Sequence, residues 1–390
     1  MNKTRVIILG AGYRGRAFAE YAKAFPDKIE IVAVADKINS ETIPASLYFD
    51  EWRDAIIAKV PADLVIVALP DSYHYEATIA SLKAGYHVLC EKPLGRSRLE
   101  CDDIKAEAAR TGKLVMVGYE LRFSRYFAQI KTIIESGAIG EVVTIAHQES
   151  VGYKKAAHSF VRGALSRAKD STPLLLSKCS HDLDLFLWWM GGKKVVGGYS
   201  FGSLQFFKRE NAPETSAEMC CECPLEGECV WSSKNIYLGS DELDYLFSDS
   251  SESAKRSIAT SEPYGRCVFK CGNDVADRQT VIYEFEGGAL ATLVISAFTN
   301  ENRRRTIITG TEGEIFADGQ EVKVNRFDGK SVMIESAVDT NESRHDGGDF
   351  NLISETLRLI SEGSAEEYAS ILTESLRSHY LAFETEKRRN

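Results

Sequence analysis

The sequence predicts an α/β fold in two parts: a doubly wound parallel sheet, then an α+β domain with a large, mostly antiparallel sheet that has one open face. Three observations predict it. Short apolar runs alternate with helical segments over about the first 120 residues. Segments of alternating polar and apolar residues follow, which suits a sheet with one covered face. The 390 residues are too many for one ordinary core. We therefore expect domains at residues 1–122 and 123–390.

The first domain contains apolar runs typical of strands buried on both faces. They lie at residues 6–9, 29–35, 64–69, 87–90 and 114–117. Helices are expected between them at 14–25, 50–59, 75–84 and 99–111. Pro26, Gly85 and Gly112 stand where three of these helices should end. This alternation predicts parallel strands joined by crossover helices.

The second domain mixes helices with alternating strands. Helices are expected at residues 127–136, 174–190, 350–362 and 366–386, and strands at 142–150, 279–285, 289–297, 305–309 and 314–317. The last helix has room to pack back on the first domain. Residues 206–275 show little periodicity and hold six of the nine cysteines, so we interpret them as an insertion.

Composition narrows the classes of partner. The net charge of -10 argues against nucleic acid, which is bound by clustered Lys and Arg, and we interpret the run Arg303-Arg304-Arg305 as a solvated turn. No stretch reaches the roughly 18 to 20 apolar residues of a spanning helix, so no membrane partner is expected. The expected location is the cytoplasm, where the cysteines should be thiols or metal ligands.

A glycine-rich turn follows the first strand. Gly10, Gly12 and Gly15 form G-x-G-x-x-G between a buried strand and a helix, the context in which this pattern predicts a Rossmann dinucleotide site. Tyr13 and Arg14 lie within the turn and are expected at the cofactor.

An acidic residue ends the second strand. Asp36 is placed to accept hydrogen bonds from a ribose and to repel a 2′-phosphate, so NAD is favoured over NADP. The neighbouring Lys37 weakens that preference because a cation tolerates a phosphate.

Four further stretches resemble the Gfo/Idh/MocA family, the group of glucose-fructose oxidoreductase and inositol dehydrogenase. They are LPDSYH at residues 69–74, AGYHV at 84–88, EKP at 91–93 and GYELRF at 118–123. The resemblance is specific over residues 1–125 and thinner beyond. It implies that Leu69, Pro70, His74, Glu91 and Lys92 lie at the cofactor.

Two residues are candidates for the chemistry. Lys92 follows a parallel strand, where it would point into the crevice, hold a substrate hydroxyl and stabilise an alkoxide. The resemblance implies that His181 is the catalytic histidine. Family members similar to inositol dehydrogenase carry Asp four residues earlier, but this chain has Ser177. Lys178 or Asp184 is expected to replace that Asp in part.

Substrate contacts are expected from residues around these two. They are Tyr119, His158, Arg162 and Lys178, together with Lys92 and His181. His158 and Arg162 lie on a predicted polar loop, where they would grip hydroxyls or a carboxylate; an ordinary surface loop is the alternative.

The cysteines of the insertion form a pattern of their own. Cys220, Cys223, Cys229 and Cys267 have spacings compatible with a closed, structural zinc site. Cys221 and Cys271 are alternative ligands. Free thiols and an iron–sulfur cluster are the competing interpretations.

These features predict an NAD-dependent oxidoreductase, and the resemblance implies a secondary hydroxyl of a sugar, sugar derivative or cyclitol as its substrate. One alternative is a glycoside-processing enzyme that keeps NAD bound through oxidation and elimination. A second is a non-catalytic protein that senses NAD or sugar, an idea suggested by Ser177. The open sheet face predicts a homodimer or homotetramer.

Overall fold

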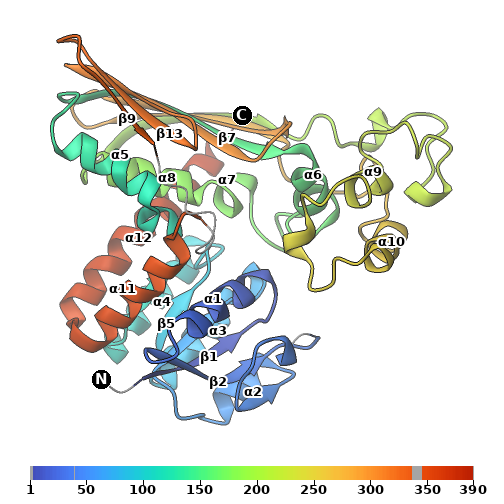
Figure 1. Ribbon diagram of the computed structural model, residues 1–390, viewed down its shortest axis with the longest axis horizontal. Helices are drawn as coiled ribbons and strands as arrows, with labels where there is room; N and C mark the ends of the chain where they lie inside the picture. The colour runs from blue at the N-terminus through green and yellow to red at the C-terminus, as the bar shows by residue number, and fades with distance from the viewer. Residues whose placement is uncertain (1–2, 39, 336–344, 390) are drawn as a thin grey trace.

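The computed structural model describes residues 3–38, 40–335 and 345–389. Two sheets organise it (Figure 1): a six-stranded sheet of order β3-β2-β1-β4-β5-β6 and an eight-stranded sheet of order β14-β13-β12-β11-β7-β10-β9-β8. The first is parallel throughout, and the second is antiparallel except for the pair β10–β7. The fold class predicted from the sequence is therefore confirmed.

The six-stranded sheet has an apolar centre, because its two middle strands are buried except for Thr4 and Arg5 at the start of the first strand. Its strands are β1 (Thr4–Leu9), β2 (Ile29–Ala35), β3 (Leu47–Phe49), β4 (Leu64–Val67), β5 (His87–Cys90) and β6 (Val115–Val117). All four residues of β4 are buried. Crossover helices connect the strands: α1 (Tyr13–Ala24), α2 (Trp52–Ile57), α3 (Asp71–Lys83) and α4 (Arg98–Thr111). Ser97 caps the start of α4, and Gly112 ends it in the left-handed conformation.

The eight-stranded sheet lies at the other end of the molecule, with helices on one face only (Figure 1). Its strands are β7 (Val142–Gly152), β8 (Val195–Ser203), β9 (Arg278–Phe285), β10 (Leu290–Thr299), β11 (Arg303–Gly310), β12 (Gly313–Ala317), β13 (Glu321–Arg326) and β14 (Ser331–Glu335). Buried and exposed positions alternate along β9 and β10. One face therefore packs on the helices and the other is open.

The helices beneath this sheet are α5 (Arg125–Glu135), α7 (Leu174–Ser177) and α8 (Ser180–Trp189). The single helix predicted over residues 174–190 is therefore wrong in one respect, because the chain breaks at Lys178 and Cys179. The break leaves the carbonyl of Ser177 outside the helical ladder, where it accepts a side-chain hydrogen bond.

The C-terminal helices α11 (Gly348–Glu362) and α12 (Ala365–Lys387) return to the first domain (Figure 1). Leu372 and Leu376 of α12 belong to the core of the six-stranded sheet, and Leu352 of α11 packs with the strands on its other face. The two halves thus share side chains along these helices.

The insertion at residues 206–275 projects to one side of the larger sheet (Figure 1). It contains short elements, among them α9 (Ser233–Tyr237), α10 (Glu252–Thr260) and the 3₁₀ turns Cys220–Glu222 and Asp244–Leu246. No helix among the described residues is long and apolar enough to cross a membrane.

The interpretation of Arg303-Arg304-Arg305 as a solvated turn is wrong. The three residues begin β11 and pair with β7. The side chain of Arg304 retains only 16% of its exposure and lies between two carboxylates. Alternation along the strand explains the error, because one arginine of the run must face inward.

Candidate active site

The glycine turn has the shape of a phosphate cradle. Gly10 has a φ of 96°, and a Cβ there would lie 2.4 Å from the Ala68 carbonyl oxygen. A Cβ on Gly15 would lie 1.9 Å from the Gly10 carbonyl oxygen, so helix and turn touch there. A Cβ on Gly12, at the N-terminus of α1, would meet no atom within 4 Å. That open approach to a helix N-terminus fits the pyrophosphate of a dinucleotide.

Asp36 stands beside this cradle. Its carboxylate accepts hydrogen bonds from the backbone N–H groups of Ala11 and Ile38, at 2.8 and 2.9 Å. The side chain is thereby fixed at the end of β2, where a ribose would meet it. Lys37 pairs with Glu51 at 2.8 Å, which raises the pKa of the lysine.

A cavity of about 570 Å³ extends from the cradle toward the second domain, a size typical of small-molecule sites. It begins at the carboxyl ends of β1, β4 and β5. Its lining consists of Tyr13, Arg14, Ala68, Leu69, Asp71, His74, Glu91, Lys92, Glu120, Lys155, Ser159, Phe160, Leu165, Ser177, Lys178, His181, Tyr245 and His345. The cavity therefore brings both chemical candidates together with residues of the glycine turn.

Lys92 reaches across the cavity from the end of β5. Its Nζ donates to the backbone carbonyl of Ser177 at 2.5 Å. Burial lowers the pKa of Lys92, and the positive charge of Lys178 lowers it further. The ammonium is thus held in place and gives up a proton more readily than a lysine in water.

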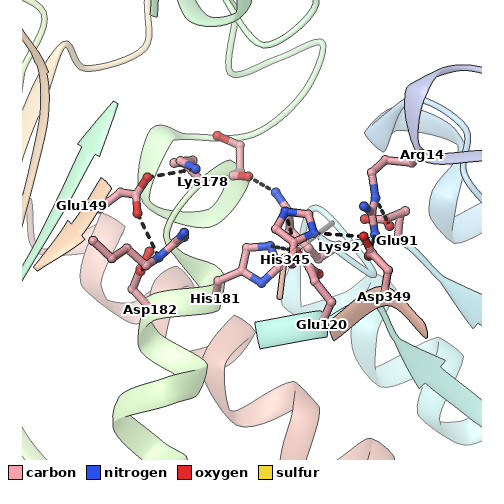
Figure 2. Close-up of polar contacts among 12 residues, drawn as sticks. Arg14, Glu91, Lys92, Glu120, Glu149, Lys178, His181, Asp182, His345 and Asp349 are labelled. Atoms are coloured by element: carbon pink, nitrogen blue, oxygen red, sulfur yellow. Dashed lines mark hydrogen bonds and ion pairs between the residues drawn. The ribbon is translucent and has the colours of Figure 1, made fainter. Parts of the chain in front are cut away.

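His181 projects from α8 beside Lys92 (Figure 2). Burial and the charges of Lys92 and Arg304 hold its pKa well below the ordinary value, so the ring is neutral at pH 7. Its Nε2 lies 3.6 Å from Oε1 of Glu120, and its Nδ1 has no hydrogen-bond partner in the part of the chain that the structure describes.

Glu120 is a carboxylate that faces His181, at 3.6 Å, in a chain that has Ser177 where an Asp was expected. It lies in the 3₁₀ turn Glu120–Phe123 and is 4% exposed. The expectation that Asp184 would support His181 is wrong: Asp184 binds Arg122 through two hydrogen bonds of 2.5 and 2.7 Å. Lys178 does not replace the Asp either, because it pairs with Glu149 at 2.9 Å.

Glu120 also begins a chain of ionisable groups (Figure 2). His345 Nε2 lies 3.5 Å from the same Glu120 oxygen, and His345 Nδ1 lies 3.0 Å from Asp349 Oδ2. Arg14 then bridges Asp349 and Glu91, at 2.6 Å from each. Burial raises the pKa of Glu120, while His345 and Arg14 hold the pKa of Asp349 below its usual range.

A second cluster lies on the sheet side of the cavity (Figure 2). Glu149 of β7 contacts Lys178 and Arg304, each at 2.9 Å. Arg304 also reaches Asp182 of α8 at 2.6 Å, and Asp182 contacts His147 at 3.0 Å. These pairs join β7, β11 and α8, so they fix the helix that carries His181.

Three predicted substrate contacts do not line this cavity. Tyr119 is 2% exposed, bonds to Ser378 and His379 of α12, and places its ring 5.6 Å from that of His181, so it supports the site from behind.

His158 and Arg162 lie in a buried π-helical turn rather than a polar loop. His158 stacks on Tyr264 at 4.6 Å, and Arg162 donates to the carbonyls of Arg266 and Trp231. Both therefore hold the insertion, not the substrate.

Of the residues that the resemblance implies at the cofactor, Leu69, His74, Glu91 and Lys92 line the cavity, whereas Pro70 lines a neighbouring pocket instead. Leu69 and Pro70 follow the end of β4. His74 of α3 is buried, and its two ring nitrogens contact the carbonyls of Pro93 and Leu69, each at 2.7 Å. His74 thus ties α3 to the turn after Lys92. Its role is to fix the backbone there.

Several cavity residues were not predicted as site residues, among them Glu120, Lys155, Tyr245 and His345. Glu120 directly follows Tyr119 in the family-like stretch, which is the one signal that pointed near it. Burial and Lys178 lower the pKa of Lys155 to about 7. Tyr245 comes from the insertion and places its ring 5.2 Å from that of Tyr13.

The nine cysteines are free thiols, and among the described residues no three His, Cys, Asp or Glu side chains are close enough to hold a metal ion as they stand. The predicted zinc site is therefore not preformed. Cys220, Cys223, Cys229 and Cys267 nevertheless line one small cavity.

Comparisons with known proteins agree with this geometry. A family model described as "Oxidoreductase family, NAD-binding Rossmann fold" matches residues 4–119. A second, "Oxidoreductase family, C-terminal alpha/beta domain", matches residues 131–374.

Individual relatives are distant. The chain is 25% identical over 330 residues to a putative oxidoreductase, YteT, of Bacillus subtilis, covering 79% of this chain and 76% of that one. It is 33% identical over 193 residues to inositol 2-dehydrogenase of Rhodococcus erythropolis, covering 45% of this chain and 53% of the other.

Among solved structures, levoglucosan dehydrogenase in complex with NADH and levoglucosan superposes with a TM-score of 0.69 at 16% identity, over 97% of this chain and 98% of that chain. At that identity the likeness concerns the fold. Because the two family models span most of the sequence, the chain belongs to the Gfo/Idh/MocA family of oxidoreductases, with an NAD-binding Rossmann domain followed by a C-terminal α/β domain.

Proposed function

We propose that the protein oxidises a secondary hydroxyl of a sugar, sugar derivative or cyclitol with NAD as the hydride acceptor. The observation that carries the proposal is the convergence of Lys92 and His181 on one cavity that also contains residues of the glycine turn. A hydrogen-bond donor and a neutral imidazole side by side are the two groups that alcohol oxidation requires from a protein. When bound, NAD supplies the site for the departing hydride.

Each residue has a defined task in this proposal. Lys92 Nζ donates to the substrate oxygen and stabilises the negative charge that develops on it. His181 accepts the hydroxyl proton at Nε2, the nitrogen that faces Glu120. Glu120 then stabilises the positive charge on the ring.

The same arrangement offers the proton a way out of the buried site. Glu120 Oε1 lies between His181 Nε2 and His345 Nε2, at 3.6 and 3.5 Å. The side chain of His345 retains 33% of its exposure, whereas that of His181 retains 7%. We propose that the proton passes from His181 through Glu120 to His345 and then to solvent.

The lining of the cavity supports a substrate with several hydroxyls. Asp71, Ser159, Lys155 and Lys178 surround the two chemical groups with further donors and acceptors. Polar groups at fixed positions orient a polyol, because each hydroxyl both donates and accepts. The relatives named inositol 2-dehydrogenase and levoglucosan dehydrogenase support the same class.

The preference for NAD over NADP rests on Asp36. Its carboxylate is held at the end of β2 by two backbone N–H groups, so a 2′-phosphate would meet a fixed negative charge. Lys37 is engaged with Glu51 and does not offset that charge.

The test is a turnover assay of the purified protein with NAD and a panel of sugars, glycosides and inositols, following NADH absorbance and product formation. We expect one class to be oxidised. His181→Asn and Lys92→Met should each lower kcat by about 10² to 10⁴ without changing NAD affinity by calorimetry.

The other outcomes separate the alternatives. Product formation without net NADH would favour the glycoside-processing reaction. NAD binding with no reaction on any member of the panel, unaffected by His181→Asn, would overturn the proposal and favour a sensor.

We also propose that the open face of the eight-stranded sheet joins two copies of the chain. Apolar side chains stand exposed on neighbouring strands of that face: Tyr199, Phe201, Ile282, Leu290, Val294, Ile307 and Phe316. Exposed apolar patches of this kind mark association surfaces. A homodimer, or a homotetramer built from dimers, would cover them.

A further inference from the structure

The cysteine cavity of the insertion lies apart from the active site. Cys220, Cys223, Cys229 and Cys267 line one enclosed space of about 30 Å³ whose remaining walls are largely apolar. A space of this size holds a single ion or one or two waters. Four cysteine thiols around a space for one ion are the ligand set of a structural zinc site.

The local backbone explains why the four thiols meet. The 3₁₀ turn Cys220–Glu222 returns the N–H of Cys223 to the carbonyl of Cys220 at 3.0 Å. A β-bridge between Met219 and Arg266 lays Cys220 beside Cys267, although 46 residues of chain separate them. A further turn, from Leu225 to the N–H of Cys229 at 2.9 Å, brings the fourth thiol.

Arg162 places a buried positive charge, without a counter-charge in the described part of the chain, beside this space. The residue is 3% exposed, and the groups that its guanidinium contacts among the described residues are two carbonyls and a thiol, not a carboxylate. Nε and Nη2 donate to carbonyls at 2.7 Å, Nη2 also lies 3.6 Å from Cys220 Sγ, and Nη1 has no partner. Burying a cation without a counter-charge is unfavourable, so a negative group is expected at the cysteines.

Neutral thiols do not supply that charge. A zinc ion with four thiolate ligands carries a net negative charge, and N–H groups of nearby residues commonly bond to its sulfurs. We propose that Cys220, Cys223, Cys229 and Cys267 bind one structural zinc ion, with Arg162 as the buried counter-cation. As they stand the thiols are not arranged around an ion, so binding requires each sulfur to turn about its one side-chain torsion, which has three staggered positions.

The site has a structural task that follows from its place. Residues 206–275 are short turns and helices without a sheet of their own, and a closed metal site supplies the cross-link that such a segment lacks. The same insertion carries Tyr245 to the wall of the active-site cavity. The metal would therefore hold that wall in place from a distance, without touching the substrate.

The experiment measures metal content of the full-length protein, purified without added metal, by elemental mass spectrometry. We expect about one zinc per chain, and after exchange, one cobalt with intense thiolate-to-cobalt absorption. Cys223→Ser and Cys229→Ser should lose the metal. Cys221→Ser is the matched control because Cys221 is exposed beside Cys220 and does not line the cavity, and it should keep the metal.

Two further measurements test the zinc site even if a cysteine variant fails to fold. In the wild-type protein, chelation should expose four additional thiols to a thiol reagent. Arg162→Gln should release zinc to a chelator at least several times faster, because the counter-charge is gone. Wild-type protein without metal, stoichiometric iron with sulfide, a disulfide among the four cysteines, or zinc retained in both Cys223→Ser and Cys229→Ser would each overturn the proposal.

Discussion

Charges placed around Lys92 and His181 set the protonation of both. Burial and the cations Lys178 and Arg304 disfavour a further positive charge, so the pKa of Lys92 and the pKa of His181 are both lowered. A neutral imidazole is the form that accepts a proton. The acid limb of the rate profile therefore lies well below pH 6.5, where His181 becomes protonated.

Glu120→Gln tests the support that this histidine receives. The substitution removes a negative charge 3.6 Å from Nε2, which destabilises the imidazolium. We expect kcat to fall about ten- to a hundred-fold and the acid limb of kcat/KM to move to lower pH, because the pKa of His181 drops further. Steady-state rates from about pH 3.5 to 9 measure both effects, because the acid limb lies well below pH 6.5.

Ser177→Ala is the control for that experiment. The Ser177 hydroxyl makes only a 3.4 Å contact with the Leu174 carbonyl, while its backbone carbonyl holds Lys92 and survives the change. Kinetics close to wild type are expected. A profile of Glu120→Gln that matches wild type, or an acid limb that moves upward, would rule out the role assigned to Glu120.

Residue identity alone predicted much of this site. Gly10, Gly12, Gly15 and Lys92 stand next to strands, so their places follow from the sheet. Glu120 and His345 are brought to His181 by a turn and by the start of α11, far apart in sequence, and no local pattern encodes that meeting. The prediction for Arg162 was wrong because a polar sequence suggested a loop, whereas its guanidinium is buried and donates to two backbone carbonyls at the insertion.

At the scale of elements, β7, β11 and α8 are joined by buried charges. Arg304→Met leaves the carboxylates of Glu149 and Asp182 without their cation. We expect a loss of about 3 to 5 kcal/mol in the free energy of unfolding at pH 7. Arg305→Met on the same strand is the control, because its side chain is 44% exposed and pairs with Glu301 only, so a loss of about 0.5 kcal/mol or less is expected.

The pH dependence of that loss has a defined sign. Arg304 holds the pKa of Asp182 far below its ordinary value, so Asp182 contributes stability above about pH 4 and loses it as the pH falls. Urea unfolding should therefore show a smaller difference between wild type and Arg304→Met at pH 3.5 than at pH 7. A difference that grows toward acid would contradict the assignment.

A substitution at the start of α1 can test cofactor binding without disturbing the fold. A Cβ on Gly12 meets no protein atom within 4 Å, so Gly12→Ala should leave Tm unchanged and weaken NAD binding about ten-fold or more, since the methyl group occupies the approach to the helix N-terminus. Gly227→Ala in the insertion is equally open and should change neither quantity. Calorimetry with NAD and thermal unfolding measure the two; unchanged affinity in Gly12→Ala would exclude the cradle.

Elements with strong periodicity were predicted, and those shaped by tertiary contacts were not. Five strands of the first sheet are continuous apolar runs and were predicted at nearly their observed bounds. The short edge strand β3 was not predicted, because it has only three residues and none of them is buried. No glycine or proline at the break between α7 and α8 predicts it from the sequence. The break is stabilised by a tertiary contact, in which Lys92 donates to the freed carbonyl of Ser177. The edge strand β8 carries Gly197, Gly198 and Gly202, which weaken its strand pattern; a Cβ on Gly198 would lie 2.7 Å from the Tyr283 ring.

At the scale of the whole molecule, the open sheet face is the largest feature without a covering element. Ile282 and Val294 stand on the neighbouring strands β9 and β10, 42% and 40% exposed. Burial of such side chains is worth about 25 cal/mol per Å² of apolar surface removed from water. When two such sheets pack face to face, both copies bury apolar side chains that stay exposed to water in the monomer, so association is favoured.

Ile282→Glu combined with Val294→Glu tests this association. Two carboxylates at the centre of an apolar interface must be desolvated or exclude the partner, so we expect the wild-type dimer or tetramer to become a monomer by light scattering at micromolar concentration. Far-ultraviolet circular dichroism should be unchanged, because both side chains point away from the core. Val230→Glu, 60% exposed in the insertion, is the matched control and should leave the assembly intact. If wild type is already monomeric, or the double variant assembles as wild type does, this face is not the interface, and another surface must explain its exposed apolar rows.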